Sequence, residues 1–231
     1  DDPSGIATYS QVGARFGFQL LWVMVLTYPL MTAIQLISAH IGRVTGCGLA
    51  RNMGEVLPKW FVTGLVALLF LANTINIGAD LAAMGQASGL IVGSGDRLLT
   101  VGLALVSLLL QLFVPYKRYA ALLKWVTLSL LAYVAVLFMV KIDWASVALG
   151  LIWPRVSGVG AWTMIVAILG TTISPYLFFW QSAQEVEEVA QHDGAKPLRD
   201  APEQAGREFQ RIRIDTFAGM AVSNLVAIAI I

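Results

Sequence analysis

Two short stretches, far apart in the chain, combine helix-breaking residues with oxygen-bearing side chains. The chain begins with Asp1–Gly5 (DDPSG) ahead of a helix-like stretch, and Ser174–Pro175 interrupts a long apolar run. Proline removes a backbone donor and glycine tolerates unusual backbone angles, so both stretches predict unwound backbone. Carbonyl groups freed from helical hydrogen bonds can bind a cation, and an adjacent aspartate supplies negative charge. The pair therefore predicts a cation site between two interrupted helices.

Each stretch also has a simpler explanation when it is considered alone. Ser174–Pro175 is compatible with an ordinary proline kink, and Asp1–Asp2 with a solvated loop that caps the following helix. Two interruptions together favour a site, because unwound backbone at membrane depth is tolerated only inside protein or beside a watery cavity. An aspartate within a membrane segment is itself a functional hypothesis.

The composition indicates an all-α, polytopic membrane protein. Of the 231 residues 58% are hydrophobic and only 13% are charged, whereas a soluble domain is about 25% charged. Mean hydropathy is +0.75. The net charge of +1 comes without a basic stripe, so nothing indicates nucleic-acid binding. Cys47 is the only cysteine, which excludes a disulfide within the chain.

Several apolar segments reach the length of about 20 residues that a membrane-spanning helix needs. One further segment, Gly5–Phe16, is too short to span alone and is expected to be the second half of a helix. The chain lacks an initiator Met and ends within an apolar run, so residues 1–231 are expected to form a single transmembrane domain, truncated at both ends. The expected spans are Phe18–Ile41, Trp60–Gly78 with a continuation through Asp80 to Val92, Leu98–Tyr116, Tyr119–Val140, Ala161–Ala183 and Phe209–Ile231.

The basic residues of the loops predict an orientation in the membrane. If the spans are numbered from the half-helix at the start, 11 lysines and arginines fall on one side and 4 on the other. Positive loops face the cytoplasm, so the first side is expected to be cytoplasmic. Its basic residues are Arg43, Arg51, Lys59, Lys117, Arg118, Lys124, Lys196, Arg199, Arg207, Arg211 and Arg213.

Four landmarks in order resemble the NRAMP divalent-metal transporters. Asp2–Gly5 falls where that family has Asp-Pro-Gly-Asn, and Gly170–Ser182 falls where it has a segment containing Met-Pro-His. The stretch from Tyr28 to Ala50 resembles its second span and cytoplasmic turn, and Ala79–Leu81 resembles the Thr-Asp-Leu of its third span. The resemblance implies a leucine-transporter-type inverted repeat with broken first and sixth helices, here from the second half of span 1 to span 7. It also implies alternating access around a site between the two breaks.

The departures from the NRAMP pattern concern the ion itself. Ser174 replaces the methionine that gives the family a sulfur ligand, and Gly5 replaces an asparagine. Tyr176 and Gln181 replace histidines used in proton handling, and Ala83 replaces an acid. Loss of a soft sulfur removes discrimination against Mg²⁺, and a larger pocket suits a partly hydrated ion. The pattern is similar to the NRAMP-related branch that takes up Mg²⁺ and Mn²⁺ without proton coupling.

The resemblance assigns roles to four expected metal-site residues. Asp2 would supply the charge, and the Thr171 carbonyl would face the ion. Ser174 would offer its hydroxyl directly or through water, and Gly5 would give room more than ligation. Asp1 would add a second charge nearby or face solvent, and both alternatives stay open.

Other polar residues have a structural interpretation that is at least as good as a functional one. Glu185 and Glu188 share a helix face and could attract cations to a cytoplasmic vestibule, but a solvated helix end is favoured. Asp80 could line the ion path, but a structural role is favoured because its neighbours offer no second ligand. Asn73 and Asn76 are read as polar contacts between helices.

The remaining predictions are that certain functions are absent. The loop Gln191–Glu208 is rich in Pro, Gly, Ala and charge, and is expected to be a solvated connector without function. His40 is expected to ligate nothing. No nucleophile with a base nearby can be assembled, so neither an enzyme nor a cofactor is expected.

The expected function is uncoupled transport of Mg²⁺ and Mn²⁺ across the cell (plasma) membrane. The expected partners are the ion and the lipid bilayer, without nucleic acid or an obligate protein partner. Three alternatives stay open. They are a proton-coupled Mn²⁺/Fe²⁺ carrier, a symporter of amino acids or other organic solutes with the same fold, and a non-transporting membrane scaffold.

Overall fold

The structure is a computed structural model that describes residues 3–93, 96–114, 125, 128–192 and 194–231, without the side chains of Pro3, Asp96 and Leu131. Asp1 and Asp2 therefore lie outside the described residues, as does most of the connection between the expected spans Leu98–Tyr116 and Tyr119–Val140.

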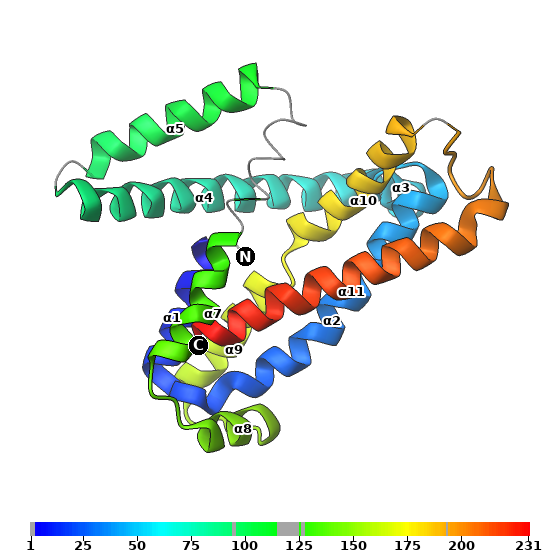
Figure 1. Ribbon diagram of the computed structural model, residues 1–231. Coiled ribbons are helices and arrows are strands. Elements are labelled where there is room, and N and C mark those ends of the chain that lie inside the picture. Colours follow the sequence, from blue (N-terminus) through cyan, green and yellow to red (C-terminus); the bar gives the residue numbers. More distant parts are fainter. Residues whose placement is uncertain (1–2, 94–95, 115–124, 126–127, 193) are drawn as a thin grey trace.

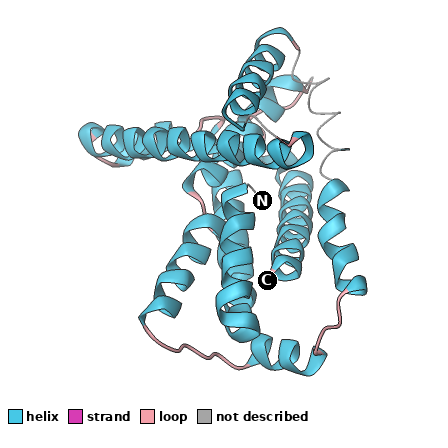
Figure 2. Cartoon of the chain, turned by 90° about the vertical axis from the view of Figure 1, so that its left-hand side faces the viewer, coloured by secondary structure: helices cyan, strands magenta, loops and turns pink. Residues whose placement is uncertain are grey.

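Every regular element in the described residues is a helix (Figure 2), which confirms the all-α prediction. In the described residues, three short 3₁₀ helices each lead directly into an α-helix. They are Gly17–Leu20 (η1), Leu128–Leu130 (η2) and Pro202–Gln204 (η3). The α-helices are α1 (Pro3–Phe16), α2 (Leu21–Thr45), α3 (Leu49–Val56), α4 (Lys59–Val92), α5 (Asp96–Phe113), α7 (Leu131–Met139), α8 (Trp144–Ile152), α9 (Val159–Thr172), α10 (Pro175–Gln191) and α11 (Ala205–Ile230).

Four stretches of helix in the described chain are long and apolar enough to cross a membrane. They are Ser4–Thr45, Lys59–Val92, Val159–Gln191 and Pro202–Ile230, with shorter apolar helices at Arg97–Phe113 and Leu128–Met139. The expected continuation of the third span through Asp80 to Val92 is confirmed, since α4 runs without a break over 34 residues. The polytopic membrane architecture follows from these lengths and compositions.

The helices form a bundle that is crossed by one long helix. In Figure 1, α2 and α11 run side by side, and α10 packs against α2. At the other end of the bundle α1 packs against α9 and α11. Both Figure 1 and Figure 2 show α4 lying across this bundle, and α5 packs along α4.

The core lies where α1, α2, α9 and α11 meet. The Tyr9 hydroxyl, on α1, lies 3.1 Å from the hydroxyl of Thr172, the last residue of α9, and ties the two helices together. The core side chains are fully or almost fully buried, and they are Tyr9, Val12, Leu20, Val23, Met24, Ala161, Ile165, Ile168 and Ala227.

The crossing helix α4 presents large apolar side chains to the outside. Phe70 is 69% exposed and Ile75 is 74% exposed. Apolar helix surfaces on this scale suit contact with lipid or with further membrane helices, because their exposure to water is unfavourable in free energy. They agree with the membrane character of the sequence.

The loop between α10 and α11 differs from the predicted solvated connector. Leu198 and Ala201 are buried. The backbone N–H groups of Leu198 and Arg199 each donate to a carbonyl at the end of α2, those of Arg43 and Val44, over 3.1 Å. The last carbonyls of a helix have no partner within the helix, so this loop satisfies two of them. The charged and polar composition of the loop did not indicate that part of it packs against the end of α2.

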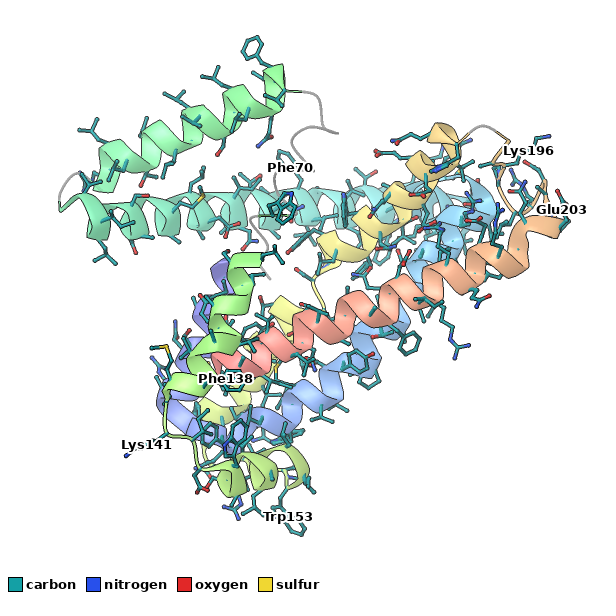
Figure 3. The ribbon with its side chains drawn as sticks, in the orientation of Figure 1. Phe70, Phe138, Lys141, Trp153, Lys196 and Glu203 are labelled. Atoms are coloured by element: carbon teal, nitrogen blue, oxygen red, sulfur yellow. The ribbon has the colours of Figure 1, made fainter. Side chains whose placement is uncertain are left out.

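The loop also marks one end of the molecule. Figure 3 shows Lys196 and Glu203 at the opposite end of the bundle from Lys141 and Trp153. Lys196 belongs to the side that the basic-residue count predicts to be cytoplasmic, and Lys141 to the other. The arrangement of these ends therefore agrees with the predicted placement of the two residues on opposite sides of the membrane.

Candidate functional site

The predicted interruption at Ser174–Pro175 is a true break between two helices. Helix α9 ends at Thr172 and α10 begins at Pro175. Between them Ile173 has φ −101° and ψ 58°, and Ser174 has φ −78° and ψ 130°, neither of which is helical. Pro175 has no N–H, so it cannot donate to the carbonyl of Thr171, four residues earlier. The proline therefore leaves the Thr171 carbonyl without its usual hydrogen-bond donor in the helix.

A cavity of about 620 Å³ opens beside this break, and we refer to it as the break cavity. Its walls come from α1, α3, α4, α9 and α10 and from the break itself. The described residues that line it are Ser4, Met53, Leu65, Leu68, Leu69, Ala72, Asn73, Asn76, Gly170, Thr171, Ser174, Pro175, Tyr176, Phe178 and Phe179.

The structure brings together two of the four predicted metal-site residues. Thr171 and Ser174 both line the break cavity. Gly5 is buried in the first turn of α1, next to Ser4, which lines the cavity from that helix. Asp2, the expected charge, lies outside the described residues, as does Asp1. Among the described lining residues none carries a formal charge.

The break cavity contains one residue that the sequence argument overlooked. Met53, on α3, contributes to its wall. The serine at position 174 predicts a site without sulfur, but the thioether of Met53 borders the same space. No group of three or more His, Cys, Asp or Glu side chains forms a metal site among the described residues. The described cavity thus offers neutral oxygen groups and one sulfur.

A second, smaller cavity of about 220 Å³ touches the break from another direction. Thr171 and Tyr176 line both cavities. The smaller one is also bounded by residues of α1, α2 and α11, including Met24 and Asn224. The backbone at the break therefore separates two spaces in the described structure.

An ion-pair network joins the far end of α10 to α2 and α11. The Glu185 carboxylate lies 2.6 Å from Nη2 of Arg211, and the Glu208 carboxylate lies 3.1 Å from Nε of Arg211. Glu208 also lies 3.3 Å from Nη2 of Arg43, whose side chain is 2% exposed. Glu185 is only 4% exposed, so the favoured prediction of a solvated helix end is wrong for this residue. Glu188 is more exposed and lies 4.0 Å from Arg211.

Helix α10 is also held closely against α2 along its length. A Cβ added to Gly42 would collide with the backbone carbonyl of Ser182. The Ser38 hydroxyl donates a short hydrogen bond to the carbonyl of Phe178. Small residues on α2 therefore let the two backbones approach, as is common between membrane helices.

Asp80 and His40 occupy structural positions. Asp80 is half-buried within the continuous helix α4 and takes part in a polar interaction. It does not belong to the described lining of the break cavity. The His40 ring packs against Phe209, with 4.5 Å between the ring centroids. The placement of Asp80 agrees with the structural role favoured from the sequence.

The fold and site define a class: a multi-pass, all-helical membrane protein with a broken helix beside a largely apolar cavity that holds a few neutral polar groups. The chain belongs to the natural resistance-associated macrophage protein-like (Nramp) family, whose model matches residues 1–231. It is similar to proteins named divalent metal cation transporter MntH. The relative from Acidiphilium cryptum is 29% identical over 244 residues, covering 100% of this chain and 52% of the relative.

Two more relatives carry the same name. The protein from Aeromonas hydrophila is 28% identical, covering 99% of this chain and 54% of the relative. A protein from Klebsiella pneumoniae is 31% identical over 191 residues, covering 79% of this chain and 45% of the relative. The chain thus spans about half the length of the relatives that it matches.

Proposed function

We propose that the protein transports divalent metal cations, Mg²⁺ and Mn²⁺, across the cell membrane by alternating access. The observation that carries this proposal is the break between α9 and α10, where Thr171 and Ser174 place polar groups in an otherwise largely apolar cavity. Family membership and relatives named as divalent metal cation transporters support it. We place residues 1–231 in a single transport domain of the leucine-transporter type, without enzymatic activity, cofactor or obligate protein partner.

The ion is held between the two interrupted helices. Asp2 supplies the negative charge from the N-terminal side of α1. The Thr171 carbonyl, which Pro175 leaves without a helical donor, and the Ser174 hydroxyl supply oxygen atoms. Gly5 keeps side-chain bulk away from this region. Oxygen ligands of this kind suit hard divalent ions, and the cavity volume of about 620 Å³ suits an ion that keeps some of its water.

The transport is driven by the membrane potential without a coupled proton. In this proposal the Asp2 carboxylate is occupied by the ion, and the described lining of the break cavity includes no carboxylate or imidazole that could carry a proton beside it. A divalent ion moving inward through the full potential gains about 4.6 kcal/mol per 100 mV, twice the value for one charge.

One observation favours a second candidate, a proton-coupled carrier of Mn²⁺ and Fe²⁺. Met53 lines the break cavity, and a thioether prefers such transition metals over Mg²⁺. If Met53 takes part, Met53→Leu lowers uptake of Mn²⁺ more than uptake of Mg²⁺. The Mg²⁺ proposal expects both rates to stay within about twofold of the wild type, because Leu is close to Met in volume.

The test is ion uptake by the full-length protein in liposomes. A luminal dye reports Mg²⁺ or Mn²⁺, a second dye reports luminal pH, and a potassium gradient sets the potential. The proposal expects uptake of both ions that increases with inside-negative potential and leaves luminal pH unchanged. Acidification that follows metal uptake would favour the coupled carrier, and failure to move any divalent ion would refute the proposed function.

A further inference from the structure

We infer that Asn73 and Asn76 are specificity-determining residues that recognise the water shell of a hydrated divalent cation in the break cavity. The inference rests on the proposed function and extends it to a wall of the cavity that the sequence did not connect with the ion. Both residues lie on α4, one helical turn apart, and both line the break cavity. The sequence alone predicts polar contacts between helices for both residues, and their place in the cavity wall adds a second possible role.

The cavity is large enough for an ion with its water. Six waters at about 30 Å³ each occupy about 180 Å³, well below the cavity volume. The cavity volume is about 620 Å³. Mg²⁺ releases its waters reluctantly and usually keeps several when a protein binds it. In a space of this size, protein groups on the far wall contact the waters of the ion rather than the metal.

The chemistry of an amide fits that contact. A metal-bound water points both protons away from the ion, so it needs hydrogen-bond acceptors around it. The side-chain carbonyl of asparagine is such an acceptor. The other α4 residues in the wall are Leu65, Leu68, Leu69 and Ala72, which accept no hydrogen bonds. The two asparagines are therefore the polar part of the described α4 wall.

Other polar residues of the lining come from separate elements. Ser4 contributes from α1, and Thr171 and Ser174 contribute from the break. Water-mediated hydrogen bonds are nearly as favourable in enthalpy as direct ones. An ion that keeps its shell can use acceptors on several of these elements. An ion that sheds waters to bind Asp2 or a sulfur directly depends less on α4. The asparagines consequently favour Mg²⁺ over Mn²⁺.

The experiment measures initial Mg²⁺ and Mn²⁺ uptake by the full-length protein in liposomes for Asn73→Leu, Asn76→Leu and Asn73→Asp. Each Leu variant is expected to lower Mg²⁺ uptake about three- to tenfold, the value of one lost hydrogen bond, and to lower Mn²⁺ uptake less. Asn73→Asp keeps an acceptor oxygen and is expected to retain Mg²⁺ uptake. The matched control is Thr74→Val, because the Thr74 hydroxyl, on the same helix, donates to the Phe70 carbonyl over 2.8 Å and lies outside the described lining.

A purely structural role predicts a different pattern. Asn76 takes part in another polar interaction. The effect of Asn76→Leu is therefore measured by thermal unfolding as well as by transport. Equal losses for both ions, together with a lower melting temperature, would overturn the inference, as would unchanged Mg²⁺ uptake in both Leu variants. In these outcomes the wild type still carries both ions and the proposed function stands. A wild type that carries neither ion would refute both.

Discussion

The Arg211 guanidinium lies 2.6 Å from the Glu185 carboxylate and joins α11 to the helix that begins at the break. Helix α10 is thus bounded by unwound backbone at Ser174 and by a nearly buried ion pair at its far end. A helix between an unwound segment and an anchoring contact can move as a unit. Under the proposed alternating access, this contact would hold α10 in one position.

The ion-pair network predicts a stability cost when one partner is removed. Glu185→Gln keeps an acceptor oxygen but removes the negative charge closest to the partly buried Arg211 guanidinium. We expect the free energy of unfolding to fall by about 1.5–3 kcal/mol, the range for hydrogen bonds to charged groups. Chemical unfolding of the full-length protein in detergent measures the change.

Its control is Glu187→Gln, which removes an exposed carboxylate from the same helix and should change little. The Arg211→Gln variant completes a double-mutant cycle. If the two effects are independent, the pairing of Glu185 with Arg211 contributes nothing and this account of the network is wrong.

The close contact of α2 with α10 predicts that Gly42 does not tolerate a side chain. A methyl group at Gly42 collides with the backbone of Ser182, so the helices must separate. Gly42→Ala should destabilise the protein by about 1–3 kcal/mol, the usual cost of overpacking. Gly219→Ala is the matched control, because nothing lies within 4 Å of an added Cβ there. Equal melting temperatures for the two variants would contradict the packing seen between α2 and α10.

The residue at the break predicts ion preference. Ser174→Met adds a sulfur and fills part of the break cavity. Both changes disfavour a hydrated hard ion, so the ratio of Mn²⁺ to Mg²⁺ uptake should rise about tenfold, equivalent to about 1.4 kcal/mol. Competition between the two ions in proteoliposomes measures the ratio. Ser88→Met, at a half-buried position of α4 outside the described lining of the break cavity, serves as the control. An unaltered ratio in the Ser174 variant would disprove the argument from size and softness.

The break and the long helices were predictable because their causes are local. Pro175 lacks an N–H whatever surrounds it, and apolar runs of about 20 residues specify membrane helices by length. The continuation of α4 through Asp80 was predictable for the same reason.

The contacts between distant segments were not predictable. Arg43, Glu185, Glu208 and Arg211 lie on three helices, and no spacing in the sequence pairs them. The loop after α10 looked solvated because its residues are polar, but Leu198 packs inward while the backbone bonds to the end of α2. Met53 and the two asparagines of α4 reach the break cavity only through the way α3 and α4 pack against the bundle.

The central claim is that an acidic residue and the unwound backbone at the break hold the transported ion together. The most direct measurement is Mg²⁺ uptake by the full-length protein in liposomes, compared between wild type and Asp2→Ala. The control Asp143→Ala removes an exposed carboxylate that caps α8. The account predicts that Asp2→Ala abolishes uptake of both Mg²⁺ and Mn²⁺ while the protein still folds and the control still transports. Wild-type uptake by the Asp2→Ala variant would contradict it.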